Sequence, residues 1–145
     1  MKQLSVKIAH LPDDWAPIRA IRRAVFQQEQ GVEEALEFDG RDDEAVQFLA
    51  SLDDRPVGTA RIRFLSQSTA KLERLAVLSD ARKQGVGQQI MQTALKFLGE
   101  KNISEIRIHA QEPVKEFYQA LGFEAEGDRF EEAGIPHFKM SKRLG

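Results

Sequence analysis

The 145-residue chain contains no cysteine, so disulfide bonds, thiolate metal sites and a cysteine nucleophile are excluded. No apolar run is long enough to cross a bilayer, and the residues after Met1 lack the apolar core of a secretory signal. No basic cluster is interleaved with aromatic residues, as a nucleic-acid surface would require. From these absences we expect a cytoplasmic protein that holds no metal and binds neither membranes nor nucleic acids.

Hydrophobic residues make up 41% of the chain and charged residues 30%, which is typical of a globular domain. No internal repeat, low-complexity tract or linker divides the sequence. We therefore expect a single domain over residues 1–145 that buries about two-thirds of the surface of its unfolded chain.

The net charge is −2, but it is distributed unevenly. Residues 29–54 contain ten acidic side chains and one basic one, whereas residues 55–107 contain ten basic and four acidic ones. Glu29 and Glu34, in the acidic stretch, are candidates for binding the ammonium group of a cationic substrate. The alternative is that this stretch is a solvated acidic loop.

Alternating apolar and polar residues predict four strands in the first half of the chain, at residues 4–9, 45–52, 57–65 and 71–78. Short turns join the last three, which predicts an antiparallel meander. Between the first two strands, apolar residues at helical spacing predict a helix that ends near Gly31. An irregular acidic segment follows that helix and extends to Asp43.

A long helix is predicted to begin at Val86 and to end near residues 100–102. It leads into a strand at residues 103–110, which should lie parallel to the strand at residues 71–78 because a helix connects the two. A short helix and two strands complete the chain. They are a helix between Pro113 and Gly122, a strand that begins at residue 123, a loop over residues 127–134 and a closing strand at residues 137–141.

Residues 82–87, Arg-Lys-Gln-Gly-Val-Gly, join the strand at residues 71–78 to the long helix. The start of a helix offers unpaired backbone N–H groups and partial positive charge. Gly85 and Gly87 let an anion approach this backbone closely, and Arg82 and Lys83 add two positive charges. The combination indicates a phosphate or pyrophosphate site. The alternative is an ordinary strand–turn–helix connection.

Two other phosphate-binding motifs are excluded by the residues after Gly87. A P-loop requires Lys followed by Ser or Thr, but Gln88 and Gln89 stand there. A dinucleotide-binding loop requires a third glycine three residues after Gly87, and that position is Ile90.

The remaining pattern, Arg-x-x-Gly-x-Gly after an apolar strand, resembles the coenzyme A pyrophosphate loop of the GNAT acyltransferase superfamily. Residues 116–123, Glu-Phe-Tyr-Gln-Ala-Leu-Gly-Phe, resemble the F-Y-x-x-x-G-F motif of the same superfamily, and the expected order of strands and helices also matches. Residues 23–32, 37–40 and 134–137 resemble the ElaA-like subgroup. The resemblance therefore covers nearly the whole chain.

The resemblance implies an α/β (α+β) fold with a mixed, mostly antiparallel central sheet. Six to seven strands would be flanked by about four helices, with a parallel pair of strands at the cofactor cleft. It also implies an N-acetyltransferase that moves an acetyl group from acetyl-CoA to a primary amine by direct attack in a ternary complex. The acceptor would be a small-molecule amine or a peptide amine, and the subunits of the superfamily often form homodimers. A non-catalytic acyl-CoA sensor on the same fold is the alternative.

By the same resemblance, coenzyme A would bind along the central strand and the loop that follows it. The residues implied in binding it are Leu75, Ala76, Val77, Arg82, Lys83, Gln84, Gly85, Val86, Gly87 and Gln88.

Tyr118, the only tyrosine, stands at the tyrosine of the F-Y motif, which in the family donates a proton to the departing thiolate. A free phenol has a pKa near ~10 and a thiol a pKa near ~8.5, so the phenol is protonated at neutral pH. The alternative role for Tyr118 is a core aromatic whose hydroxyl reaches the surface.

Glu73, His109 and His137 are candidates for the general base that deprotonates the amine. Strict alternation places Glu73 on the same face as Leu75 and Val77, in the region where many family members have a catalytic glutamate. The alternative for Glu73 is a surface carboxylate paired with an arginine such as Arg61 or Arg63. His109 lies near the end of a strand and is either functional or structural. His137 lies in the Gly-Ile-Pro-His stretch, and the ordinary pKa of histidine suits a base near neutrality.

Overall fold

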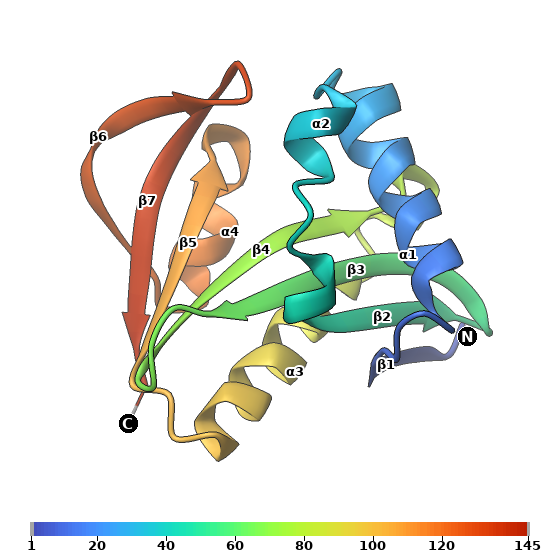
Figure 1. The fold of residues 1–145 in the computed structure, drawn as a ribbon, viewed down its shortest axis with the longest axis horizontal. Coiled ribbons are helices and arrows are strands. Elements are labelled where there is room, and N and C mark those ends of the chain that lie inside the picture. The colour runs from blue at the N-terminus through green and yellow to red at the C-terminus, as the bar shows by residue number, and fades with distance from the viewer. Residues whose placement is uncertain (1, 145) are drawn as a thin grey trace.

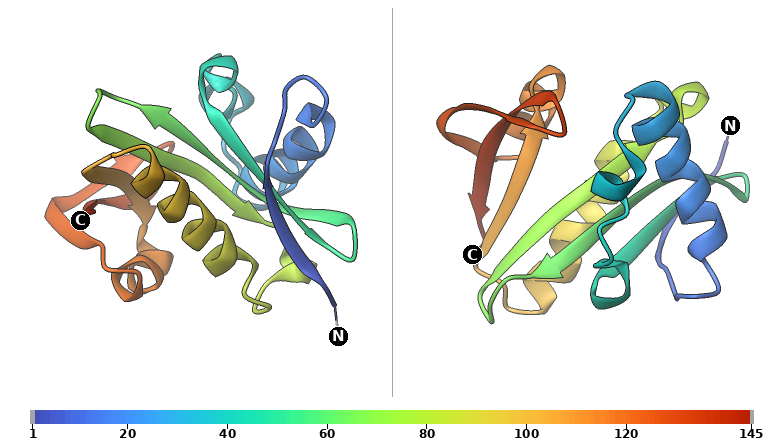
Figure 2. Two further views of the ribbon diagram at one scale, coloured as in Figure 1. Left: turned by 90° about the horizontal axis from the view of Figure 1, so that it is seen from below. Right: turned by 45° about the horizontal axis from the view of Figure 1, so that its top comes forward.

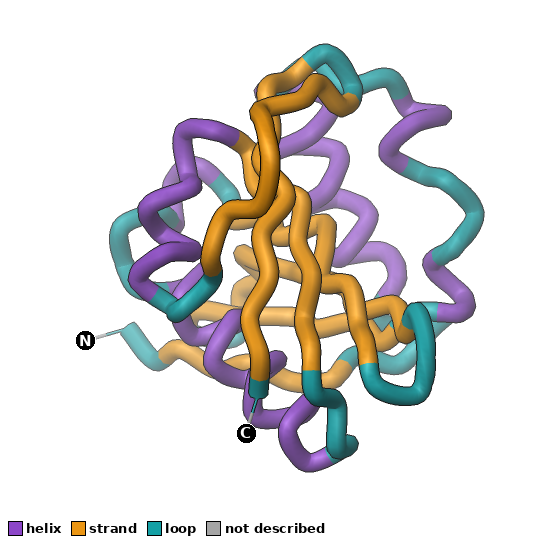
Figure 3. Tube along the Cα trace, turned by 90° about the vertical axis from the view of Figure 1, so that its left-hand side faces the viewer, coloured by secondary structure: helices purple, strands orange, loops and turns teal. Residues whose placement is uncertain are grey.

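Seven strands form one sheet in the order β1-β2-β3-β4-β5-β7-β6. The structure, a computed structural model, describes residues 2–144. Neighbouring strands are antiparallel except β4 and β5, which are parallel. Figure 3 shows the C-terminal strands standing steeply across the N-terminal ones, so the sheet is strongly twisted. The strands are β1 (Leu4–Ile8), β2 (Val46–Leu52), β3 (Arg55–Phe64), β4 (Thr69–Val77), β5 (Glu105–Gln111), β6 (Glu124–Glu132) and β7 (Ile135–Arg143).

Helices cover both faces of the sheet (Figures 1 and 2). On one face lie α1 (Trp15–Arg22), its π-helical continuation η1 (Arg23–Glu29) and α2 (Glu34–Glu37). On the other face lie α3 (Val86–Glu100) and α4 (Lys115–Ala120). Three short 3₁₀ turns are η2 (Asp42–Glu44), η3 (Ser79–Ala81) and η4 (Glu112–Val114). Within residues 2–144, no helix combines the length and the apolar character needed to cross a bilayer.

The predicted architecture is confirmed in its main lines. Strands β2, β3 and β4 form the antiparallel meander, and α3 connects β4 to the parallel strand β5. The sheet has seven strands, and four α-helices flank it, as the resemblance implied.

The predicted loop over residues 127–134 is wrong. Strand β6 continues to Glu132, and only Ala133 and Gly134, both with positive φ, form the turn into β7. The pairing of β6 with β7 is irregular between Glu126 and Phe130, and this bulge holds Gly127 at a φ of +72°. A glycine that indicated a loop therefore lies at a bulge inside a strand.

The N-terminal half also differs from the prediction in two places. The first helix is α-helical only as far as Arg22, and its last seven residues are π-helical. The acidic segment after it is not irregular throughout, because it contains α2 and the turn η2. Apolar periodicity did not indicate α2 or η2, because charged side chains, described below, hold these two elements in place.

The larger hydrophobic core lies between the sheet and α3, and the smaller one lies between the sheet and α1. In the larger core, α3 packs almost directly on the backbone of β3. A Cβ atom at Gly58 would lie 2.9 Å from Cδ1 of Ile90 and 3.0 Å from Cγ1 of Val86. The absence of a side chain at Gly58 therefore sets the distance between α3 and the sheet.

We expect Gly58→Ala to lower the free energy of unfolding by about 1–3 kcal/mol, because the added methyl group must displace the buried side chains of Ile90 and Val86. Gly99→Ala is the matched control. Gly99 lies inside α3, and a methyl group added there would point into open space. It should raise the free energy of unfolding by about 0.4–1 kcal/mol through the entropy of the unfolded chain. Urea denaturation followed by circular dichroism measures both, and equal effects of the two substitutions would contradict the packing argument.

Candidate active site

A cleft opens where β4 and β5 separate. The two strands pair over only three residues, Thr69–Lys71 with Glu105–Arg107, and then diverge (Figure 1). The cleft between them has a volume of about 820 Å³. Its walls come from η1 and α2 on one side and from β5, α4 and the β6–β7 turn on the other. The diverging stretch of β4 therefore has one backbone edge that faces the cleft without a partner strand.

A β-bulge at Arg74 lies in the middle of β4. Arg74 has a φ of +59°, and the pairing with β3 shifts between Arg61↔Glu73 and Thr59↔Ala76. The side chain of Arg74 holds this conformation by donating to the carbonyl oxygens of Glu37 (3.2 Å) and Leu36 (3.1 Å) in α2. The bulge thus also fastens α2 to the central strand.

The bulge overturns one prediction. Strict alternation placed Glu73 on the same face as Leu75 and Val77, but the extra residue reverses the faces between them. Leu75 and Val77 pack against the larger core beneath the sheet. Glu73 lies on the opposite face, where it meets Arg61 and Arg63.

The predicted phosphate loop, residues 82–87, leads into the start of α3. Gly85 caps the helix with a φ of +80°, a left-handed conformation that glycine adopts without strain. The Gln89 N–H donates to the carbonyl oxygen of Gly85 (3.0 Å), so the N–H groups before it belong to the unpaired first turn. Lys83 and Gly87 line the cleft, whereas the Val86 side chain is buried in the core. The side chains of Gln84 and Gln88 do not line the cleft.

Arg82 and Glu29 form an ion pair between the phosphate loop and η1. Both Nη atoms of Arg82 lie 2.6 Å from the carboxylate oxygens of Glu29, and its Nε donates to the carbonyl oxygen of Val77 (3.0 Å). The hydrogen bond from Arg82 holds the pKa of Glu29 below its usual value. Glu34, the other candidate for an ammonium ligand, is exposed, pairs with Arg23 (3.3 Å) and does not line the cleft.

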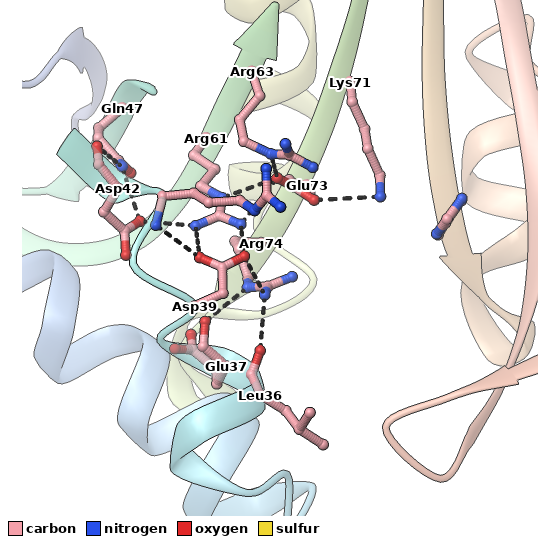
Figure 4. Close-up of polar contacts among 12 residues, drawn as sticks. Leu36, Glu37, Asp39, Asp42, Gln47, Arg61, Arg63, Lys71, Glu73 and Arg74 are labelled. Atoms are coloured by element: carbon pink, nitrogen blue, oxygen red, sulfur yellow. Dashed lines mark hydrogen bonds and ion pairs between the residues drawn. The ribbon is translucent and has the colours of Figure 1, made fainter. Parts of the chain in front are cut away.

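A network of ion pairs, centred on two buried arginines, forms part of the cleft wall on the face covered by α1 and α2 (Figure 4). Arg22 is fully buried and bonds Glu37 (2.6 Å) and Asp42. Arg61, also fully buried, bonds Asp42 (3.1 Å) and makes a two-pronged bond to Asp39 (2.7 and 2.9 Å). The alternative of a solvated acidic loop is therefore wrong for these three carboxylates, which are the counter-ions of buried arginines.

The network lowers the pKa values of its carboxylates. Burial alone would raise the pKa of Asp39, but hydrogen bonds and positive charge from Arg61 hold it well below its usual range. Burial would likewise raise the pKa of Asp42, but the hydrogen bond and positive charge of Arg22 outweigh it, and the pKa is lowered.

Glu73 joins this network to the cleft. It accepts bonds from Arg61 (2.9 Å) and Arg63, and its second oxygen lies 3.5 Å from Nζ of Lys71. Burial would raise the pKa of Glu73, but these three cations lower it. Glu73 is therefore the arginine-paired carboxylate that the sequence offered as an alternative to a base.

The two candidate histidines are joined by Glu132, a residue that sequence reasoning missed. Nδ1 of His109 lies 2.9 Å from Oε1 of Glu132, and Nε2 of His137 lies 3.7 Å from Oε2. The hydrogen bond from His109 lowers the pKa of Glu132. Nδ1 of His137 donates to the carbonyl oxygen of Ile135 (2.7 Å). All three side chains line the cleft.

Tyr118 lies in α4 and lines the same cleft. Its ring packs edge-on against Phe117 and Phe123, and only 8% of the residue is exposed. Burial raises the pKa of its phenol above the ordinary value.

The sequence pattern of the family described as Acetyltransferase (GNAT) domain matches residues 13–144. The chain belongs to this family. The match covers η1, the β4 bulge, the phosphate loop and the β6–β7 hairpin, so every wall of the cleft lies inside the GNAT domain.

Three known proteins illustrate the relationship. YyaT of Bacillus subtilis (strain 168) is 39% identical over 127 residues, which cover 86% of this chain and 85% of YyaT. The crystal structure of ElaA from Escherichia coli has a TM-score of 0.84 and 26% identity, and the alignment covers 98% of this chain and 99% of ElaA. An aminoglycoside 6′-N-acetyltransferase complexed with coenzyme A shares the fold, with a TM-score of 0.78 and 16% identity over 96% of both chains. The predicted likeness to ElaA is thereby confirmed.

The lowered pKa values of the carboxylates in the ion-pair network give the stability of the GNAT domain a defined pH dependence. Because Asp39, Asp42 and Glu73 have lower pKa values folded than unfolded, their stabilisation is complete above the unfolded pKa of about 4 and is lost as the pH falls below it. We expect Asp39→Asn to be less stable than the wild type at pH 7 and the difference to shrink on acidification. Urea denaturation at a series of pH values measures it.

Asp54→Asn, at an exposed turn position, is the control for this series and should leave the pH dependence unchanged. A difference between wild type and Asp39→Asn that stays constant down to the acid transition would show that the Asp39 carboxylate does not supply the pH-dependent stability.

Proposed function

We propose that the cleft is the site at which an acetyl group passes from acetyl-CoA to a primary amine by direct attack in a ternary complex. The observation that carries this proposal is the separation of β4 from β5 beside the phosphate loop. A ligand whose phosphates bind at the start of α3 has an unpaired backbone edge of β4 along which its chain can extend. This arrangement suits a long phosphorylated thioester.

The residues proposed for coenzyme A are those of the loop over 82–88 and of β4 over 75–77. The first N–H groups of α3 and the ammonium of Lys83 provide positive potential for a pyrophosphate. A Cβ atom at Gly87 would be 3.6 Å from Phe117 and 3.9 Å from Val77, so a larger side chain there would fill the space beside the loop. Unpaired N–H groups of β4 after the bulge are suited to polarise a thioester carbonyl. Acetyl-CoA, when bound, supplies the activated acyl group.

We assign the acceptance of the amine proton to His137. A carbonyl oxygen can only accept a hydrogen bond, so the contact with Ile135 fixes the proton on Nδ1 and leaves Nε2 as the basic nitrogen. The carboxylate of Glu132 lies 3.7 Å from Nε2 and stabilises the imidazolium that forms. His109, bonded to the other Glu132 oxygen, orients this carboxylate. Glu73 suits the role less well, because its lowered pKa makes it a weak base.

Tyr118 is assigned as the proton donor to the departing thiolate. Its raised pKa keeps the phenol protonated at neutral pH, and it lies at the cleft wall formed by α4. The donor and the base therefore come from different elements that line the same cleft, α4 and the β6–β7 hairpin.

We expect Gly87→Val to weaken acetyl-CoA binding by about tenfold or more, because its side chain occupies the space that the pyrophosphate needs. Gly99→Val, in the same helix but with open space around it, is the control and should bind as the wild type does. Calorimetric titration with acetyl-CoA, and with ATP as a comparison ligand, measures the affinities. Unchanged affinity in a folded Gly87→Val variant would remove the loop from the proposed site.

Tyr118→Phe should lower kcat by about 10²-fold or more while leaving the Kd for acetyl-CoA unchanged. Release of the coenzyme A thiol with a panel of primary amines measures turnover, and calorimetry measures binding. A wild-type protein that binds acetyl-CoA tightly but acetylates no amine would favour the alternative function, a non-catalytic acyl-CoA sensor.

A further inference from the structure

The carboxylates that line the cleft are all paired, as far as residues 2–144 show. Glu29 is bonded to Arg82, and Glu132 is bonded to His109. The remaining three are Glu37, Asp39 and Glu73, and each is bonded to an arginine of the network. The acidic stretch therefore presents little unbalanced negative charge to a substrate.

In the ion-pair network that lines the cleft, the cations outnumber the carboxylates. The network joins four carboxylates, Glu37, Asp39, Asp42 and Glu73, to five cations. Two of those cations, Arg22 and Arg61, are fully buried, and Arg74 bonds carbonyl oxygens of α2. The excess positive charge therefore lies at the remaining two, Arg63 and Lys71.

Arg63 and Lys71 stand opposite each other on β3 and β4, and the only carboxylate within ion-pair distance of them in residues 2–144 is Glu73, although the charge of Lys71 also acts on Glu132. They are register partners in the antiparallel pair, a position in which two like charges repel. Glu73 lies between them (Figure 4), and it is also the partner of Arg61. One negative charge is thus shared by three positive ones.

Most of the hydrogen-bond donors of this pair are unused within the described chain. Arg63 bonds Glu73 through Nε, and its two terminal nitrogens have no partner there. Lys71 has only the 3.5 Å ion pair with Glu73. Their side chains are 19% and 18% exposed, so solvent screens them less than it screens surface cations. Both line the cleft.

The pair is separate from the phosphate loop. Arg63 and Lys71 lie on the face covered by η1 and α2, before the β4 bulge, whereas Lys83 lies beyond the opposite end of β4. Their neighbours across the cleft are His109 and Glu132, the groups that we assign to the support of His137, the acceptor of the amine proton. The unused donors therefore face the acceptor side of the cleft.

We propose that Arg63 and Lys71 form an anion-binding subsite for the acceptor, and that the acceptor is a primary amine that also carries a carboxylate. This inference rests on the proposed acetyltransferase function. The guanidinium and ammonium groups bind the carboxylate and relieve their mutual repulsion. The amino group of the same molecule then lies towards His137 and the acyl group. The acceptor is thus a zwitterion in solution, in contrast to the purely cationic substrate suggested by the acidic stretch.

The test compares amines in matched pairs that differ only in the carboxylate: glycine with methylamine, β-alanine with ethylamine, γ-aminobutyrate with propylamine, and leucine with isopentylamine. Initial rates of thiol release with acetyl-CoA give kcat and KM for each. We expect the carboxylate-bearing member of at least one pair to have a kcat/KM about tenfold or more above its partner. Equal kcat/KM values throughout would overturn the inference and leave the proposed function intact.

Substitutions of the two cations test whether the preference for the carboxylate arises at Arg63 and Lys71. Lys71→Met and Arg63→Met should raise KM for the preferred carboxylate-bearing amine by about tenfold and leave the carboxylate-free amine unchanged. Lys71→Arg should retain the preference, and Lys96→Met, an exposed lysine on α3, is the control. Circular dichroism and thermal melting check that each variant is folded. A preference that survives in both methionine variants would overturn the assignment of the subsite.

A binding measurement separates failure of this inference from failure of the proposed function. NMR titration of the coenzyme A complex with the same amines reports binding without turnover. Binding that requires the carboxylate and is removed by Lys71→Met would support the subsite, even if no amine were acetylated. Absence of an acetylated product with every amine would remove the proposed function. Equal binding of both members of every pair, or binding of neither, would overturn the inference.

Discussion

A guanidinium group cannot be left unpaired away from water without a large cost in free energy. This protein buries two of them, Arg22 in α1 and Arg61 in β3. Both must be neutralised by carboxylates from the segment between η1 and β2, so Asp39 and Asp42 decide where that segment lies. One wall of the cleft is therefore positioned by ion pairs, whereas the floor beneath β4 is positioned by apolar packing on α3.

The bulge at Arg74 connects these two kinds of packing. Before it, β4 turns its charged side chains to the ion-pair network, and after it the side chains of Leu75 and Val77 on that strand turn to the apolar core. The same residue ties α2 to the strand through two carbonyl oxygens. The position of α2 and the direction of the β4 side chains thus depend on one extra residue in one strand.

Local patterns in the sequence were sufficient for the order of strands and helices, because apolar periodicity and turn residues act over a few positions. The position of the glycine loop before α3 was also predictable, since its glycines are contiguous with the helical pattern. The bulge was not, and strict alternation therefore placed Glu73 on the wrong face. Glu132 was missed because Gly127 indicated a loop where β6 continues. The pairing of Asp39 with Arg61 joins residues 22 positions apart, and only the polar face of β3 indicated that buried arginines needed partners.

The ion pair between Glu29 and Arg82 connects η1 to the loop that precedes α3. An anion that takes the donors of Arg82 must release Glu29, and a cation that takes Glu29 must release Arg82. Binding free energies at two linked sites are reciprocal. A ligand that breaks this ion pair at one end of the cleft would therefore change the affinity for a ligand at the other end, and by linkage the two changes would be equal.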